Sequence, residues 1–319
     1  MQKGTGALVK IKKPHLLVIG GTGFIGYNLL LSARKKGWKL SSLSLNYPKK
    51  YRYISDVNYI SADITNLLEL KKKLKGQYQY VVNSGGYGVL NSSNYENKKI
   101  LNTHFIGVVN LVTIFEKKNI LKFVQIGTGD EYGLAKAPQK ENITDLPFSA
   151  YGLAKYYATE FLKLKYRIKK FPVTVLRFFL VFGPHQNKKK IISHAIINCL
   201  LDKKFKLTKG NQKRDYCYIE NIIEAIFLAL KAKKNDGEVI NIGSGNPKTV
   251  KTLVKCINRL IGKGKPLFGA INYRNYENKN IYPDIKKANK KLKWKPKISV
   301  LKGLELTINY YKGILKINE

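Results

Sequence analysis

The chain has 319 residues, 44% of them hydrophobic and 25% charged, so it can bury a full core as one large α/β unit or as a nucleotide-binding domain with a smaller companion. It contains no apolar run long enough for a signal or membrane-spanning segment, so we expect no membrane partner. Its three scattered cysteines argue against a disulfide framework or a zinc site. We therefore expect a metal-free protein of the reducing cytoplasm with buried cysteines. The formal charge of +39 comes from basic residues, mostly lysines, spread from end to end, and this diffuse pattern indicates a solvated surface that attracts anionic nucleotides rather than a nucleic-acid partner.

A glycine turn near the N-terminus is the first candidate site. The apolar run His15–Gly20 predicts a strand, and Phe24–Lys36 predicts an amphipathic helix. The turn between them carries Gly20, Gly23 and Gly26, and glycines without a Cβ let phosphate groups approach a helix N-terminus. The turn therefore predicts a site for the pyrophosphate of a dinucleotide; a tight turn that binds nothing is the alternative.

Strands and helices alternate along the first part of the chain, and this order predicts the fold. Strands separated by helices imply right-handed crossovers and a parallel sheet. We therefore expect an α/β fold with a doubly wound parallel sheet, a Rossmann domain, over residues 1–182. The further strand-like runs are Leu40–Leu45, Asn58–Ile60, Tyr80–Asn83, Phe123–Gly127 and Val173–Phe179, and the helical periods between them include Ile100–Lys117 and Tyr156–Ile168.

The pattern changes in the later part of the chain. Ile191–Leu201 and Asn221–Ala232 predict helices, and Glu238–Ile242 predicts a strand. We expect residues 183–319 to form mainly a smaller, partly discontinuous substrate-binding lobe at the carboxyl edge of the sheet, with some segments returning to the first domain.

The spacing Tyr-x-x-x-Lys occurs five times, so its context has to decide which pair is functional. On a helix this spacing places a phenol and an ammonium on one face, where the ammonium lowers the pKa of the phenol and prepares it for proton transfer. Tyr151 and Lys155 open an uninterrupted helical period, whereas Tyr132 lies in a loop where its lysine need not face it. We expect Tyr151 and Lys155 beside the nicotinamide end of a cofactor, within reach of the Thr128 hydroxyl at the end of the preceding strand.

Six short motifs follow one another along nearly the whole chain. They are Gly20–Gly26, Asp63-Ile64, Gly127–Gly133, Tyr151-x-x-x-Lys155, Leu176–Pro184 and Arg214–Glu220. In this order and spacing they resemble the extended short-chain dehydrogenase/reductase family, and within it the NAD(P)-dependent nucleotide-sugar epimerase/dehydratase branch. Leu267–Arg274 and Leu180 are most similar to reductases of 4-keto-deoxyhexoses, such as CDP-abequose or CDP-paratose synthases.

This resemblance implies a role for each matching residue. Tyr151 would exchange a proton with the sugar C4 oxygen, Lys155 would tune Tyr151 and hold the nicotinamide ribose, and Thr128 would hydrogen-bond the reacting oxygen. The implied cofactor contacts are Gly20, Gly23, Phe24, Ile25, Gly26, Ser44, Asp63, Ile64 and Lys155. The implied substrate contacts are Arg214, for the diphosphate, with Arg274 and Asp130 as further candidates; an ordinary ion pair of Arg214 with Asp215 is the alternative.

Departures from the family pattern refine these expectations. Ser44 stands where an NAD-dependent member ends its second strand with an acidic residue, and nearby Lys49, Lys50 and Arg52 favour NADP, with NAD as the alternative. Gly129 separates the catalytic threonine from the Asp-Glu pair that a dehydratase places directly after it, so elimination is less expected than redox chemistry. His104, near the position of a structural asparagine, is expected to be a packing residue.

We therefore expect NAD(P)-dependent redox chemistry at C4 of a nucleotide-diphosphate sugar, first of all reduction of an NDP-4-keto-deoxyhexose. An NDP-sugar 4-epimerase with tightly bound NAD is the alternative, and a 4,6-dehydratase is less expected. A non-catalytic dinucleotide-sensing or RNA-binding relative would keep the fold without the chemistry. Analogy with the family also implies a homodimer that packs through Ile100–Lys117 and Tyr151–Arg167.

Overall fold

The computed structural model describes residues 13–86, 94–143, 145–273 and 278–316. Arg274, one of the expected substrate contacts, lies outside these residues. The strands are β1 (His15–Ile19), β2 (Lys39–Ser44), β3 (Val57–Ser61), β4 (Tyr80–Asn83), β5 (Lys122–Thr128), β6 (Val173–Phe178), β7 (Leu180–Phe182), β8 (Lys204–Leu207), β9 (Lys213–Arg214), β10 (Tyr216–Tyr218), β11 (Val239–Ile242), β12 (Lys248–Thr249), β13 (Lys265–Phe268) and β14 (Asn280–Ile281). The α-helices are α1 (Phe24–Lys35), α2 (Leu67–Lys73), α3 (Asn94–Leu101), α4 (Gly107–Phe115), α5 (Ala150–Lys169), α6 (Ile191–Leu200), α7 (Ile219–Lys231), α8 (Val250–Ile261), α9 (Lys286–Leu292) and α10 (Val300–Leu315).

Seven parallel strands form the main sheet, in the order β3-β2-β1-β4-β5-β6-β11. The sheet grows in one direction from β1 to β3 and in the other from β4 onward. In open α/β sheets, ligands bind outside the carboxyl ends of the strands at this switch point. The expected α/β fold with a doubly wound parallel sheet is confirmed.

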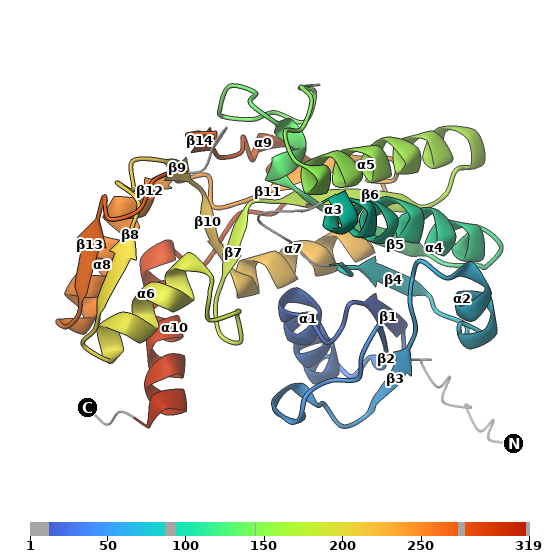
Figure 1. The fold of residues 1–319 in the computed structure, drawn as a ribbon. Coiled ribbons are helices and arrows are strands. Elements are labelled where there is room, and N and C mark those ends of the chain that lie inside the picture. Colours follow the sequence, from blue (N-terminus) through green and yellow to red (C-terminus); the bar gives the residue numbers. More distant parts are fainter. Residues whose placement is uncertain (1–12, 87–93, 144, 274–277, 317–319) are drawn as a thin grey trace, which may run out of the picture.

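Strand β1 shows why helices cover both faces of this sheet (Figure 1). Its side chains are buried along its whole length, which is typical of a parallel strand enclosed on both sides. Leu16 and Val18 belong to the core that α1 and α7 cover, whereas Leu17 and Ile19 belong to the core under α2, α4 and α5. The alternation of side chains along one strand thus supplies two separate hydrophobic layers.

A smaller lobe lies beside the main sheet and contains α6, α8 and α10 (Figure 1). Its strands form short pairings: β7 with β10, β8 with β13, and β9 between β12 and β14. Between β10 and β12 the chain returns to the main sheet with α7 and with β11, where Val239 pairs with Val175 of β6, and it then re-enters the smaller lobe. The exact division into two domains at residue 182 stays a prediction.

The predicted helix Ile100–Lys117 is part of a longer and interrupted element. It starts at Asn94 with α3, passes through a π-helical turn at Asn102–Ile106 and continues as α4 to Phe115. A π turn inserts a residue into the α-helical ladder and changes which side chains face inward. This turn lies next to the carboxyl edge of the sheet, where the candidate site is found.

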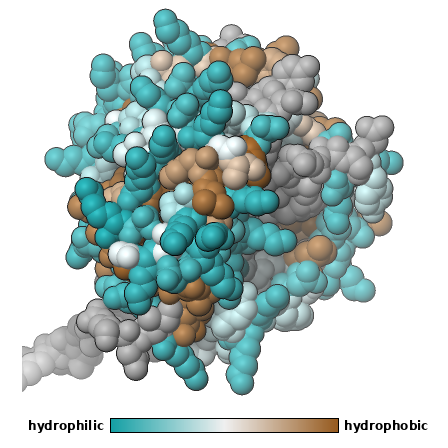
Figure 2. Space-filling model, turned by 60° about the vertical axis from the view of Figure 1, so that its left-hand side comes forward, coloured by the Kyte–Doolittle hydropathy of each residue, from teal (hydrophilic) through white to brown (hydrophobic). Residues whose placement is uncertain are grey.

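The surface follows the diffuse charge of the sequence. Figure 2 shows one face on which hydrophilic side chains predominate and hydrophobic residues form small separate patches. In the part of the chain that the structure describes, we find no helix with the length and apolar character needed to cross a membrane.

The cysteines differ in burial. Cys199 and Cys217 are buried as expected, but Cys256 is partly exposed, so the expectation that all three are buried is wrong for Cys256. It lies on α8 at the edge of a buried stripe that includes Leu253 and Ile257, and the amphipathic helix leaves that edge open to solvent.

Candidate active site

The glycine turn between β1 and α1 has the geometry of a phosphate-binding turn. Gly20 has a φ of +78°, and a Cβ at this position would lie 2.7 Å from the Cα of Gly85. At Gly26 a Cβ would lie 2.4 Å from the carbonyl oxygen of Gly20, so both positions require glycine. Gly23 caps α1 without any side-chain hydrogen bond to the first turn, which contains Phe24 and Ile25. The amides of that turn are therefore arranged as in helix N-termini that bind phosphate.

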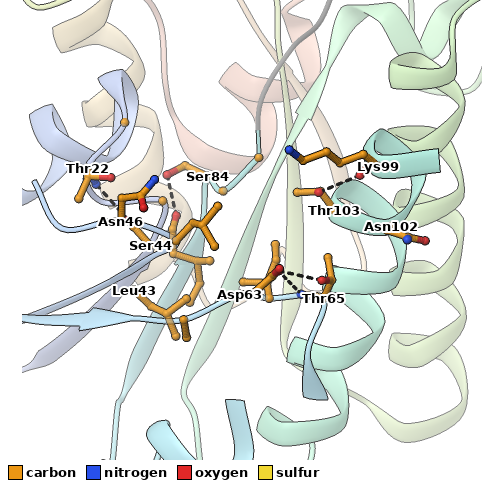
Figure 3. Close-up of a pocket in the computed structure, with 18 of the residues that line it drawn as sticks. Thr22, Leu43, Ser44, Asn46, Asp63, Thr65, Ser84, Lys99, Asn102 and Thr103 are labelled. Atoms are coloured by element: carbon orange, nitrogen blue, oxygen red, sulfur yellow. Dashed lines mark hydrogen bonds between the residues drawn. The ribbon is translucent and has the colours of Figure 1, made fainter. Parts of the chain in front are cut away.

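A cavity of about 580 Å³ lies at the carboxyl ends of β1, β2, β3 and β4 (Figure 3). Five of the expected cofactor residues line it together: Gly20, Gly23, Ser44, Asp63 and Ile64. The cavity runs from the glycine turn to the ends of the strands that lie beyond it in the sheet, which fits an elongated dinucleotide with its pyrophosphate at the turn.

Two of these residues are fixed by their neighbours. The carboxylate of Asp63 accepts hydrogen bonds from the backbone N–H and the hydroxyl of Thr65, each at 2.8 Å (Figure 3). Ile64 packs against Gly107, where a Cβ would lie 2.7 Å from the Ile64 side chain. The loop after β3 thus presents a preformed wall to the cavity.

Sequence reasoning missed the contribution of α3 to this cavity. Lys98, Lys99, Asn102 and Thr103 line it from the side opposite the glycine turn, and Figure 3 shows Lys99 reaching from α3 toward the strand ends. The start of α3 is polar and lacks the apolar period that predicts a helix. The two adjacent lysines were the one available signal, and they bring positive charge to this side of the cavity.

The basic residues that favoured NADP are placed differently from the expectation. Arg52 donates hydrogen bonds to the carbonyl oxygens of Thr22, at 2.8 Å, and His185, at 2.6 Å. Lys49 and Lys50 are exposed and do not belong to the lining of the cavity. Arg52 therefore holds the glycine turn against the loop after β7, and the structure gives no support for an NADP preference.

Thr128, Tyr151 and Lys155 come together next to the end of β5. The Ser149 hydroxyl caps α5 by accepting a hydrogen bond from Gly152 N at 3.0 Å, so the helix begins just before Tyr151. The Lys155 Nζ lies 6.0 Å from the centre of the Tyr151 ring. Thr128, which ends β5, lies close enough to the Tyr151 phenol for its hydroxyl to act to lower the pKa of that phenol. The three expected catalytic side chains therefore share one location.

The electrostatics of this group differ from the expectation. Burial raises the pKa of Tyr151, and the negative charges of Asp130 and Glu131 raise it further. Burial also lowers the pKa of Lys155 to about 8, although Glu131 opposes this effect. Lys155 Nζ donates a hydrogen bond to the Ile126 carbonyl, at 2.9 Å. The net shift of the Tyr151 pKa is upward, and a lowering of this pKa by Lys155 stays a prediction.

The two acidic residues after Thr128 have separate environments. Glu131 is fully buried: one carboxylate oxygen accepts from Thr128 N at 2.8 Å, and the other accepts from Arg177 Nε at 2.7 Å and from the Thr159 hydroxyl at 2.8 Å. Asp130 is exposed, and Arg214 and Thr128 are among the groups that interact with its side chain. Glu131 thus has a structural role, and Asp130 is the one residue of the pair whose side chain is accessible to a ligand.

The second copy of the Tyr-x-x-x-Lys pentapeptide has a structural role. Tyr132 is buried in a short 3-10 turn, η3 (Gly129–Tyr132), and its hydroxyl donates to the Asn241 side chain at 2.7 Å. Lys136 is exposed, so this lysine does not face its tyrosine. The choice of Tyr151 over Tyr132 agrees with this arrangement.

Arg214 lies on β9, mostly buried, and its guanidinium donates to the Lys213 carbonyl at 2.9 Å. The carboxylate of Asp215 instead accepts from the backbone and the hydroxyl of Ser244, the latter at 3.0 Å. Arg214 acts electrostatically on Asp130, which places it near the catalytic group. The alternative of a simple ion pair between Arg214 and Asp215, both among the described residues, is therefore not seen, and a substrate-binding role of Arg214 stays a prediction.

His104 has a contact that sequence reasoning did not anticipate. It lies in the π turn, buried, with its ring edge-on to Tyr151 at a centroid distance of 5.0 Å. Gly86 leaves the space for this ring, since a Cβ there would lie 2.0 Å from His104 Cε1. His104 is a packing residue as expected, and the side chain that it packs is the expected catalytic tyrosine.

The sheet order and the cavity at its carboxyl edge define the nucleotide-binding α/β class. Residues 16–243 match the family described as the NAD dependent epimerase/dehydratase family. A putative UDP-glucose 4-epimerase from Methanocaldococcus jannaschii is 30% identical over 312 residues, which cover 93% of this chain and 98% of that protein. The chain therefore belongs to the NAD dependent epimerase/dehydratase family, as its motifs predicted.

Solved structures agree with this assignment. A UDP-glucose 4-epimerase from Thermotoga maritima, solved with UDP-glucose, has a TM-score of 0.87 at 27% identity and covers 94% of this chain and 99% of its own. A mutant UDP-glucuronic acid 4-epimerase from Bacillus cereus, in complex with UDP-4-deoxy-4-fluoro-glucuronic acid and NAD, has a TM-score of 0.86 at 26% identity with the same coverage. These relatives are epimerases, so the narrower resemblance to 4-keto-deoxyhexose reductases stays a prediction.

Proposed function

We propose that this chain is an NAD-dependent nucleotide-diphosphate-sugar 4-epimerase, the second of the two reactions considered from the sequence. The observation that carries the proposal is the group of Thr128, Tyr151 and Lys155 next to the end of β5, one strand from the cavity that would hold the dinucleotide. The names of the similar proteins support epimerisation over net reduction.

The residues present fit NAD. The uncapped first turn of α1 would hold the pyrophosphate, Asp63 would lie at the adenosine end, and Lys98 and Lys99 would add positive charge from the other side of the cavity. When bound, NAD supplies a reversible hydride acceptor. We choose NAD over NADP because Arg52 is committed to two backbone carbonyls.

Each side chain of the site would have its own role in the reaction at C4 of the sugar. Tyr151 removes the proton of the C4 hydroxyl and later returns it to the C4 oxygen, while Thr128 holds that oxygen by a hydrogen bond. Lys155 would place a positive charge beside the phenol and the nicotinamide ribose. Arg214 would bind the diphosphate of the substrate, for which a guanidinium offers a planar pair of donors.

The homodimer expected from the family also belongs to this proposal. Several apolar side chains are exposed or only partly buried on the outer side of the helices around α4 and α5: Phe105, Ile106, Tyr157, Phe161, Leu164 and Ile168. Contiguous apolar surface of this kind is typical of a protein interface. A second copy of the chain is the proposed partner, and sedimentation of the purified protein measures it.

A turnover experiment tests the function. The purified protein is incubated with UDP-glucose or UDP-galactose and a catalytic amount of NAD, while chromatography follows the sugars and absorbance follows NADH. We expect interconversion of the two sugars without net formation of NADH. Stoichiometric consumption of NADPH with a nucleotide 4-keto-deoxyhexose, and no interconversion, would instead establish the reductase.

A further inference from the structure

We propose that Asp130 selects the sugar, so that the site takes neutral hexoses in preference to hexuronic acids. The inference rests on the proposed 4-epimerase function and adds the class of substrate. It depends on which group faces the part of the sugar next to the reacting carbon.

The position of Asp130 is fixed by the cap of a short turn. Thr128 caps η3 (Gly129–Tyr132), and its hydroxyl accepts a hydrogen bond from the backbone N–H of Asp130 at 3.2 Å. The backbone of Asp130 also lies against the start of α5, since a Cβ at Gly152, the residue after Tyr151, would lie 2.7 Å from the Asp130 carbonyl oxygen. Asp130 therefore lies beside both Thr128 and the start of α5, where the phenol of Tyr151 is expected to exchange the C4 proton.

The structure of the sugar then determines which chemical group lies opposite the Asp130 carboxylate. If Tyr151 and Thr128 hold the C4 oxygen, the neighbouring carbon C5 and its substituent C6 lie in the immediate surroundings. The hydroxymethyl group of a neutral hexose can donate a hydrogen bond to a carboxylate. The carboxylate of a hexuronic acid has no proton to donate and carries a charge of the same sign, so Asp130 would repel it.

The charges around Asp130 do not remove this repulsion. Arg214 and Lys190 act on Asp130, but Arg214 is assigned to the substrate diphosphate and Lys190 is exposed at the start of α6. Glu131 is neutralised by its buried pair with Arg177 and offers nothing to the sugar.

Three nucleotide sugars test the inference. The ratio kcat/KM is measured for UDP-glucose, for UDP-glucuronic acid and for UDP-xylose, which has no C6, with the wild-type protein and with Asp130→Asn. We expect the wild type to prefer UDP-glucose over UDP-glucuronic acid by at least about tenfold, and Asp130→Asn to reduce this preference by about tenfold or more. Turnover of UDP-xylose should change much less. Glu305→Gln removes an exposed carboxylate on α10 and is the matched control, expected to leave all three ratios unchanged.

Each other result has a definite meaning. If the wild type uses UDP-glucuronic acid as well as UDP-glucose, or if Asp130→Asn lowers all three sugars equally, Asp130 does not select the sugar and the inference is overturned. If the wild type interconverts no nucleotide sugar in the presence of NAD, the proposed function itself has failed. Should Asp130→Asn not fold, Asp130→Ser is measured instead, and the wild-type preference alone still decides against the inference when it is absent.

Discussion

The cofactor region and the substrate region of this site are built in different ways. The cofactor region uses backbone groups and neighbouring residues of the glycine turn, β1 and the ends of β2 and β3. The substrate region instead brings together side chains from distant elements, Thr128 from β5, Tyr151 from α5 and Arg214 from β9. Backbone binding tolerates changes of most side chains nearby, whereas the chemistry depends on a few side chains and on the buried contacts that hold them.

The largest expected effect is on the chemical step alone. Replacing Tyr151 with Phe should reduce kcat by about 10²- to 10⁴-fold, because the phenol that exchanges the C4 proton is lost. Binding of NAD, measured by calorimetry, should stay within about twofold, since the cofactor region is untouched. Tyr156→Phe, at the next tyrosine along α5 and five residues after Tyr151, is the control and should retain full activity. Equal activity of both variants would remove Tyr151 from the mechanism.

A second change tests the buried support of the substrate region. Glu131→Gln should lower the free energy of unfolding by about 3–5 kcal/mol, because it leaves the buried Arg177 guanidinium without its counter-ion. Thermal unfolding measures this loss. Glu305→Gln, which removes an exposed ion pair, should change the stability by less than about 1 kcal/mol. If both variants lost a similar amount of unfolding free energy, the buried pair of Glu131 and Arg177 would stabilise the fold no more than an exposed pair does.

A third change addresses the backbone geometry of the cofactor region. Gly20→Ala should weaken NAD binding and cost about 1–2 kcal/mol of stability, because an L-residue is strained at a φ of +78° and its Cβ would meet Gly85. Gly313→Ala is the matched control in α10, where a Cβ has open space, and should be neutral or slightly stabilising. Titration with NAD measures the loss of binding, and thermal unfolding measures the loss of stability separately. Unchanged NAD affinity in Gly20→Ala would move the pyrophosphate away from this turn.

The smallest effect is a dependence on pH. Burial lowers the pKa of Lys155 to about 8, so its positive charge is lost as the pH rises through that value and kcat/KM should fall above it. The folded pKa lies below that of the unfolded chain, so the unfolded state binds the proton more strongly. The free energy of unfolding should therefore rise with pH above about pH 8. In Lys155→Met the free energy of unfolding should not rise in this way. If kcat/KM and the free energy of unfolding of the wild type both stay constant above pH 8, the lowered pKa of Lys155 is contradicted.

The main sheet was predictable from the sequence because most of its strands are short apolar runs separated by helical segments. β1 and β6 are buried along their whole length, and the helical period of α5 lies between two such strands. The strands of the smaller lobe were not predicted, because β9, β12 and β14 have two residues each and take their form from pairing with distant segments. Short α2 also lacks a sufficient apolar period.

The site was predictable where a motif follows a strand and not where it depends on packing. Strand order alone brings Gly20 and Thr128 to the same edge of the sheet. The sequence gives no sign that Glu131 pairs with Arg177, 46 positions away, or that the π turn directs His104 at Tyr151. Such contacts arise from the folded geometry, and a pattern of residue types does not specify them.

The guanidinium of Arg52 has a mechanical consequence. It is bonded at once to the carbonyl of Thr22, inside the glycine turn, and to the carbonyl of His185, whose ring in turn contacts Tyr310 of α10. A shift of α10 relative to the sheet would act through these contacts on Arg52 and on the glycine turn. If this turn holds the dinucleotide as proposed, a movement of the smaller lobe and release of the nucleotide would be coupled through the Arg52 side chain.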